Sequence, residues 1–290
     1  MLAVLLACLS AATFGLLSVT LRIGLRDGRV AAEDASLLTS LSALVVTLVI
    51  ALVSLAWQGG ATVGNLSPFL LTGVLAPGLA QLFFVRGIRE VGASRTSVVV
   101  GTAPLVAVAI ALVALNEPAR PELLLAAVLV VAGSIALGFE PDRPTEFRRI
   151  GILFALLCTL LFATRDDLLR WLARGTSAPP LPAAAVATAA GAATLLAFLL
   201  ATRRVSRATL RVAGPRFLLP GALFGISYAF LFEAYYRGRV TVVSPLVATE
   251  SLFGVLFAVL LLRRSERVGA HVVIGAVLVV AGGVIIGATR

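Results

Sequence analysis

Long apolar segments alternate with short polar connections along the whole chain. Each segment is about 20 residues long, the length that a helix needs to cross about 30 Å of hydrocarbon. Backbone N–H and C=O groups inside a bilayer must be satisfied within the segment, so we expect helices. The pattern predicts ten such segments, at residues 2–22, 36–57, 67–86, 96–115, 121–139, 150–170, 181–202, 217–236, 241–262 and 269–288. The predicted fold is therefore an all-α integral membrane protein with ten transmembrane helices.

The second half of the sequence repeats the first. The run AVLVVAG at 127–133 returns at 276–282, and PFLLTG at 68–73 corresponds to RFLLPG at 216–221. Both pairs are separated by nearly the same number of residues, which indicates two copies of one structural unit. In membrane proteins, such repeats commonly form two bundles that move about a site between them.

The segment FEPDRPTEFRRI, near the middle of the chain, mixes charges and prolines. Such a composition is typical of a linker. We therefore expect a first repeat at 1–140, a linker at 141–149 and a second repeat at 150–290. Each repeat holds five predicted helices, an odd number, so the second repeat enters the membrane in the opposite sense. This inverted arrangement is typical of many secondary transporters.

Composition agrees with a lipid environment, because 60% of the 290 residues are hydrophobic and only 13% are charged. The mean hydropathy is +1.05. The formal net charge of +10 would also fit a nucleic-acid partner. The basic residues, however, are scattered over short loops and form no patch or groove, so we expect no nucleic-acid binding. Cys8 and Cys158 both lie inside apolar segments, which argues against a disulfide framework.

The distribution of arginine predicts the orientation of the chain. Of the 24 basic residues, 17 lie in or beside the connections that follow the first, third, fifth, seventh and ninth segments. Six lie at the other connections, and Arg290 ends the chain. Basic residues gather on the cytoplasmic side of membrane proteins. We therefore expect a multi-pass protein of the cytoplasmic membrane with both chain ends outside the cytoplasm.

Two runs, one in each half, carry a family resemblance. They are GASRTSVVVGTAPLVAVAIALVALNEP at 92–118 and EAYYRGRVTVVSPLVATESLFGVLFAVLLLRRSER at 233–267. Together with the two-fold five-helix layout, they resemble the EamA repeats of the drug/metabolite transporter superfamily. The resemblance covers essentially the whole chain. It implies a ten-helix permease that moves amino acids, nucleobases, sugars or other metabolites.

In that family, a span with a central proline precedes a short turn that contains Glu, and a Gly-rich helix follows. Pro104, Glu117 and Gly133 match this order in the first half. Glu266 and Gly282 match it in the second half, which has no proline corresponding to Pro104. These are packing and turn motifs, so they identify the architecture and not the substrate.

Charged residues inside the predicted spans are the best guide to a transport site, because each costs about 2.5 to 3.5 kcal/mol to insert at a helix centre. Glu250 lies near the middle of its span and is the candidate for proton coupling or for binding a substrate amine. Arg165 is the candidate anchor for a carboxylate or another anion. Asp166 can pair with Arg170 one helical turn later. Structural roles stay open, because Glu250 can bond to a neighbouring helix and the other charges can form an interfacial cluster.

Three further groups are candidates for a polar cavity. Tyr228 and Tyr235 lie on one helical stripe beside Glu233, and this stripe either lines a cavity or packs in the core. Gln81 follows a Pro–Gly pair, where a helix break can expose backbone carbonyls. Thr13 is a polar residue of the first span. The alternatives for these last two residues are a bond to a neighbouring helix and a bond to the preceding turn.

No motif for enzymatic chemistry is present. The single histidine, His271, cannot form a histidine-based metal cluster, and no HExxH, phosphate-binding loop or dinucleotide-binding glycine fingerprint occurs. We expect no cofactor and no metal. The sequence predicts a secondary active transporter that moves a small polar metabolite, such as an amino acid, by alternating access, with proton coupling as an option. The alternatives are a flippase for lipids or lipid-linked head groups and a non-transporting membrane subunit, and the oligomeric state stays open.

Overall fold

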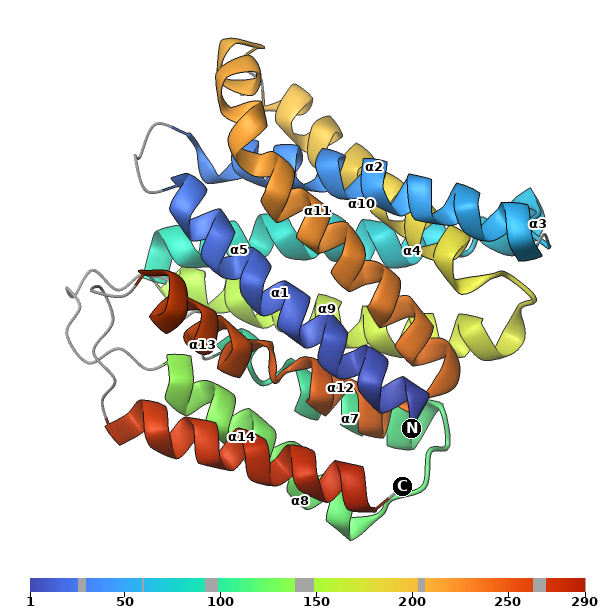
Figure 1. Cartoon of the computed structure of the whole chain (residues 1–290), viewed down its shortest axis with the longest axis vertical. Coiled ribbons are helices and arrows are strands. Elements are labelled where there is room, and N and C mark those ends of the chain that lie inside the picture. Colours follow the sequence, from blue (N-terminus) through green and yellow to red (C-terminus); the bar gives the residue numbers. More distant parts are fainter. Residues whose placement is uncertain are drawn as a thin grey trace.

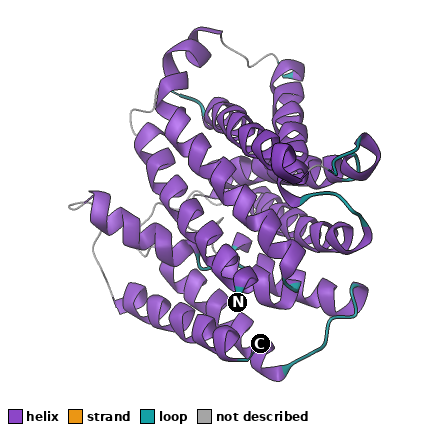
Figure 2. Ribbon diagram, turned by 45° about the vertical axis from the view of Figure 1, so that its right-hand side comes forward, coloured by secondary structure: helices purple, strands orange, loops and turns teal. Residues whose placement is uncertain are grey.

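The structure of the chain is a computed structural model, which describes residues 1–25, 30–58, 60–91, 99–138, 149–202, 207–262 and 270–289. All regular secondary structure within these residues is helical (Figure 2). The helices are α1 (Leu2–Leu25), α2 (Ala32–Gln58), α3 (Val63–Leu66), α4 (Phe69–Gly73), the π-helix η1 (Val74–Leu79), α5 (Ala80–Val91), α7 (Ala103–Ala114), α8 (Pro121–Gly138), α9 (Arg149–Gly175), α10 (Pro180–Ala201), α11 (Arg207–Arg237), α12 (Val240–Val247), α13 (Glu250–Leu262) and α14 (Ala270–Ala288). Residues 141–148 of the predicted linker and Glu266 lie outside the described residues.

Six helical stretches are long and apolar enough to cross a membrane. They are Leu2–Leu25, Glu33–Trp57, Val63–Phe84, Pro180–Ala201, Gly214–Arg237 and Val240–Leu261. Three shorter apolar helices accompany them, at Ala103–Ala114, Pro121–Leu137 and Val273–Ile286. These stretches confirm the prediction of an all-α membrane protein that crosses the bilayer several times.

Three of the predicted spans are not continuous α-helices, and one of them, at 96–115, is interrupted by a turn at residues 101–102. The span predicted at 67–86 passes through α4, the π-helix η1 and α5, and Ala76 inside η1 has the non-helical angles φ −149° and ψ 125°. The next residue, Pro77, has no N–H to donate and cannot continue a regular ladder. The span predicted at 241–262 is divided into α12 and α13 by a turn at residues 248–249.

The turn between α12 and α13 has a counterpart in the first half of the chain. In the second half, the Thr249 hydroxyl donates a hydrogen bond of 2.6 Å to the carbonyl of Leu246. In the first half, a turn at residues 101–102 precedes α7, and the Thr102 hydroxyl donates a bond of 2.6 Å to the carbonyl of Val99. In both turns the threonine side chain bonds back to the preceding turn of the chain, to a carbonyl that also accepts a backbone N–H.

The helices of the two halves pack in an exchanged pattern (Figure 1). Helix α1, which begins the first half, packs on α11 and α13 of the second half. Helix α9, which begins the second half, packs on α5 and α7 of the first half. Likewise α2 packs on α11, while α10 packs on α4 and η1. The core therefore lies at the interface between the halves, and neither half buries its own core alone.

The duplicated run AVLVVAG lies where α8 and α14 pack against each other. A methyl group added at Gly133 would lie 2.6 Å from the carbonyl oxygen of Gly275, and one added at Gly282 would lie 2.7 Å from that of Ala126. Such distances are shorter than van der Waals contact. Small residues here let the two backbones approach closely, as is common between membrane helices.

Both chain ends lie side by side at one end of the bundle (Figures 1 and 2). The Arg120 guanidinium donates a hydrogen bond of 3.1 Å to the carbonyl of Thr289, so the segment between α7 and α8 contacts the C-terminus. Gly238, between α11 and α12, lies against Ala3 near the N-terminus. We call this end of the bundle the terminal face.

Gly15 and Gly254 offer a matched test of the contact between α1 and α13. A methyl group at Gly15 would lie 2.7 Å from the backbone nitrogen of Gly254 and 2.9 Å from the carbonyl oxygen of Glu250, whereas one at Gly254 would come no closer than 4.0 Å to α1. Gly15→Ala should therefore lower the free energy of unfolding by about 1 to 3 kcal/mol, as other overpacked cores do. Gly254→Ala, the control, should be at least as stable as the wild type. Thermal unfolding in detergent measures both, and equal stability of the two variants would contradict the close contact.

Candidate functional site

A group of charged side chains lies inside the apolar bundle. Arg165, Asp166 and Asp167 of α9 are only 5%, 7% and 5% exposed, and Glu250 at the start of α13 is partly buried. The charges of Arg165, Asp166 and Glu250 lie close enough to act on one another. We call these three residues the central charged group. Burying ionised side chains is costly unless each has a partner, so their partners define the site.

Arg165 is held by a carboxylate and by aromatic rings. Its Nε lies 3.1 Å from Oδ1 of Asp166. Its guanidinium carbon lies 5.5 Å from the ring centre of Tyr228 on α11 and 5.7 Å from that of Phe162 on α9. A guanidinium over an aromatic face gains cation–π stabilisation, which is largest where water is excluded. The Nη1 atom of Arg165 is buried and has no hydrogen-bond partner among the described residues, so it is available to a ligand.

Asp166 is bound to α12 as well as to Arg165. The Ser244 hydroxyl donates a hydrogen bond of 3.2 Å to Oδ2 of Asp166, and the Tyr235 hydroxyl lies beside both groups. The predicted pair of Asp166 with Arg170 is not what the structure contains. Arg170 instead donates hydrogen bonds of 2.8 and 3.2 Å to the carbonyls of Tyr235 and Tyr236. The correction has a simple cause, because the free carbonyls at the end of α11 compete for this guanidinium.

Glu250 is the first residue of α13 and follows the turn that ends α12. A carboxylate at this position is favoured by the dipole and the free N–H groups of the helix N-terminus. Gly15 of α1 packs against its backbone, so a helix of the first half forms one wall of the site. The central charged group is therefore surrounded by helices from both halves of the chain.

The aromatic stripe of α11 is buried beside this group. Tyr228, Phe232 and Tyr235 are each at most 3% exposed. The ring centres of Tyr228 and Phe224 lie 4.7 Å apart in an edge-to-face arrangement, which is a favourable geometry for aromatic pairs. Tyr228 therefore contacts both the guanidinium of Arg165 and the ring of Phe224. The stripe combines packing with contact to the charged group.

The structure does not bring the other predicted site residues to the central charged group. Glu233 forms an ion pair with Arg237 near the end of α11. The amide nitrogen of Gln81 donates a hydrogen bond of 3.2 Å to the Ser36 hydroxyl, which joins α5 to α2. The Thr13 hydroxyl donates to the carbonyl of Leu9 at 2.7 Å, within its own helix. The bond of Gln81 to a neighbouring helix and the bond of Thr13 to its preceding turn are the structural roles that the sequence left open for these two residues.

Glu117 has a role that the sequence pattern did not reveal. Its two carboxylate oxygens accept hydrogen bonds of 2.9 Å each from the backbone N–H groups of Val240 and Thr241. Glu117 therefore caps the N-terminus of α12 from another segment of the chain, while Arg170 binds the last carbonyls of α11. Opposite charges thus stabilise both helix ends that flank the turn at residues 238–239. Only the tertiary structure places Glu117 there, because 123 residues separate it from Val240.

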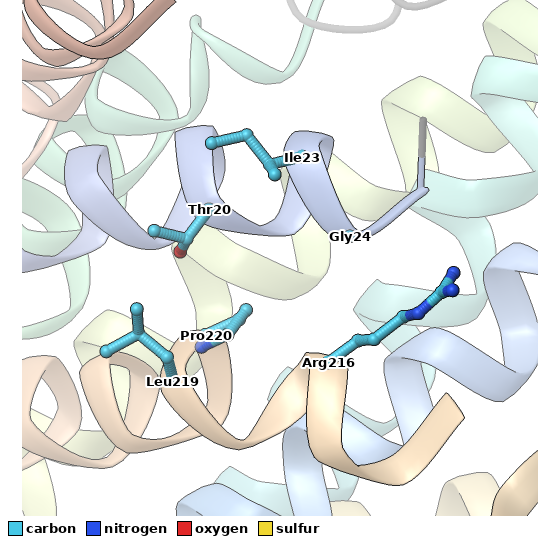
Figure 3. Close-up of a pocket in the computed structure, with 6 residues that line it drawn as sticks. All are labelled: Thr20, Ile23, Gly24, Arg216, Leu219 and Pro220. Atoms are coloured by element: carbon cyan, nitrogen blue, oxygen red, sulfur yellow. The ribbon is translucent and has the colours of Figure 1, made fainter. Parts of the chain in front are cut away.

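Two pockets at the surface lie between helices of the bundle. One, of about 380 Å³, lies between α1 and α11 (Figure 3). It is lined by Thr20, Ile23, Gly24, Arg216, Leu219 and Pro220. Another, of about 400 Å³, lies between α2 and α11. Neither includes a residue of the central charged group. Among the described residues, no group of three or more His, Cys, Asp or Glu is placed to hold a metal ion.

Comparison with known families decides the identity of this fold. The sequence matches the EamA-like transporter family twice, over residues 1–139 and over residues 149–288. The chain belongs to the EamA-like transporter family. The resemblance inferred from the two runs is thereby confirmed, and the buried charges belong to a membrane transporter.

A solved structure supports the fold of this EamA-like transporter. The structure, described only as "Crystal structure of protein", shares 21% sequence identity with a TM-score of 0.75 and covers 96% of this chain and 95% of its own. At that identity the similarity shows the fold alone. No curated protein matches the sequence significantly.

The capping of α12 by Glu117 can be tested with a neutral substitution. Glu117→Gln leaves one side-chain oxygen for two buried N–H groups, so the free energy of unfolding of the transporter should fall by about 1 to 3 kcal/mol. Glu122→Gln is the matched control, because Glu122 lies nearby at the exposed start of α8. Thermal unfolding in detergent compares the two variants. An unchanged midpoint for Glu117→Gln would show that the cap contributes little.

Proposed function

We propose that the protein is a secondary active transporter that moves a small polar metabolite, such as an amino acid, by alternating access. Ten transmembrane helices form two inverted repeats, 1–140 and 150–290, joined by a linker at 141–149. One observation carries the proposal: Arg165 and Asp166 are buried, and the partly buried Glu250 lies within electrostatic reach of both, where helices of both halves meet. Intramembrane ionisable groups at such an interface are typical of substrate and ion pathways.

The charges favour a solute that carries both signs. Arg165 presents a buried Nη1 donor to a carboxylate or another anion, and Glu250 presents a carboxylate to an amine or a proton. Guanidinium–carboxylate pairs are strong and directional when water is excluded. Tyr228 and Phe232 give the site an apolar wall. In this proposal Arg165 anchors the solute, Asp166 orients Arg165, and Glu250 couples the cycle to protons.

Alternating access requires that the site open to one side at a time. Glu117 and Arg170 bind the ends of α12 and α11 at the terminal face, and in this proposal these contacts hold that face closed. The turns at 101–102 and 248–249 and the π-helix η1 interrupt the helices around the site. Interrupted helices of this kind form ion and substrate sites in many secondary transporters. We infer that the segments on either side of these interruptions move against each other during transport.

The proposal includes an orientation, with the terminal face outside the cytoplasm and the arginine-rich connections inside. Single cysteines test it in a variant that lacks Cys8 and Cys158. Thr62→Cys, in an exposed connection after the second predicted span, should react with a membrane-impermeant maleimide in intact cells. Thr202→Cys, exposed in the connection after α10, should react only after the membrane is permeabilised. The reverse result would invert the proposed topology.

The coupling role of Glu250 is tested by Glu250→Gln in proteoliposomes. The substitution keeps the shape of the side chain and removes its exchangeable proton. Solute exchange at equal pH on both sides should continue, whereas accumulation driven by a pH gradient should be lost. Glu233→Gln is the control, because Glu233 pairs with Arg237 away from the site and should leave both activities unchanged. If Glu250→Gln still accumulates solute along a pH gradient, Glu250 does not couple transport to protons.

A further inference from the structure

Asp167 is a buried carboxylate that has no partner among the described residues. It is 5% exposed, and neither of its carboxylate oxygens has a hydrogen-bond partner in the described part of the chain. Asp166, the preceding residue, is bound by Arg165 and Ser244. Glu117 is bound by two backbone N–H groups. Asp167 is therefore a buried acid that the proposed binding site does not use.

The charged groups near Asp167 make its ionised form unfavourable. The carboxylates of Asp166 and Glu117 act on it with like charge. Arg165 forms its ion pair with Asp166, and Arg170 donates its hydrogen bonds to backbone carbonyls. A second negative charge here would be buried, repelled and unpaired, which is the most costly state for a carboxylate inside a membrane.

Most described side chains on the helices packed against α9 are uncharged. Helices α4, η1 and α7 contain no ionisable side chain. Helix α5 contributes Glu90 near its end and Arg86, which lies over the ring of Phe154, more than three helical turns before Asp167. Helix α11 contributes the phenols Tyr235 and Tyr236 and the ion pair of Glu233 with Arg237, and α12 contributes hydroxyls only. No cation among the described residues pairs with Asp167, so we expect a bound proton to neutralise it.

The position of Asp167 links the central charged group to the terminal face. Adjacent residues point about 100° apart on a helix, so Asp166 and Asp167 face different neighbours. Asp166 faces Ser244 of the site, while Asp167 lies within the electrostatic reach of Glu117, at the capped end of α12. Thr241, whose backbone N–H binds Glu117, is 2% exposed, and its hydroxyl lacks a partner among the described residues. Two unpartnered polar side chains therefore lie between the site and the terminal face.

We propose that Asp167 is a second protonation site, which carries protons between the central charged group and water at the terminal face. The inference rests on the proposed function, because it gives that transporter a route for its coupled proton. In this conformation Asp167 holds a proton as a neutral acid. When the terminal face opens, Asp167 gives this proton to the carboxylate of Asp166 or Glu250 and becomes ionised. It then takes a proton from water that enters past Glu117.

Infrared spectroscopy tests the protonation of Asp167 without any transport assay. The wild type at neutral pH should show the carbonyl stretching band of a protonated carboxylic acid, and Asp167→Asn should lose it. Asp166→Asn is the matched control on the adjacent residue, and it should lose carboxylate absorption while keeping the acid band. Loss of a carboxylate band from Asp167→Asn would overturn the proposal, because it would show that Asp167 is ionised.

Transport in proteoliposomes tests the role of the proton. Asp167→Asn should reduce accumulation driven by a pH gradient by more than about tenfold, since a positioned proton donor contributes at least that much to a transfer step. Exchange at equal pH should stay at the wild-type rate, and Asp167→Glu should restore the gradient-driven accumulation. The restored variant excludes a purely structural effect of the substitution.

The two proposals fail in different ways. If Asp167→Asn keeps gradient-driven accumulation while Glu250→Gln loses it, the inference about Asp167 is wrong and the proposed transporter stands. If the wild type exchanges solute but never responds to a pH gradient, proton coupling is wrong and the role of Asp167 falls with it. If the wild type moves no small polar solute at all, the proposed function itself is wrong.

Discussion

The ion pair between Arg165 and Asp166 is the interaction on which the other features of the site depend. A charge of either sign inside an apolar bundle must be paired, and removing one partner leaves the other exposed to hydrocarbon. Tyr228 covers the guanidinium and Ser244 binds the carboxylate, so α11 and α12 are both fixed to α9 by this pair. The interruption before Glu250 then places a third charge within reach. Helices α9, α11 and α13, which contribute to the site, also pack against helices of the first half.

At the terminal face, charged side chains are likewise paired, here with the free backbone groups of helix ends. The turn between α11 and α12 leaves carbonyls on one side and N–H groups on the other, and Arg170 and Glu117 satisfy them with matching charge. Glu117 comes from the first half and the turn from the second, so this contact also joins the halves. A transporter must break such contacts in each cycle. A few hydrogen bonds at one turn are a smaller barrier than a packed helix interface would be.

The sequence predicts the features that depend on local composition. Hydrophobic length identified the helical segments, and the repeated run AVLVVAG lies where α8 and α14 pack together. Buried charge identified Arg165, Asp166 and Glu250, which the structure brings together. Features that depend on distant partners were not predictable: Arg170 binds carbonyls of α11, and Glu117 caps α12 across 123 residues. The interruption in η1 coincides with a proline that the sequence shows, Pro77, whereas residues 248–249 themselves are neither glycine nor proline, so the place of that turn was not predicted.

The most direct test of the central claim is solute exchange in proteoliposomes by the double variant Arg165→Gln, Asp166→Asn. Removing both charges together leaves neither member of the ion pair without its partner, so the fold should survive. Labelled amino acids, nucleobases and sugars are offered to the wild type first, and the class that it exchanges is then offered to the variant. The account predicts saturable exchange by the wild type that the folded double variant loses. Exchange by the variant at the wild-type rate would show that the buried pair only supports the structure and binds no solute.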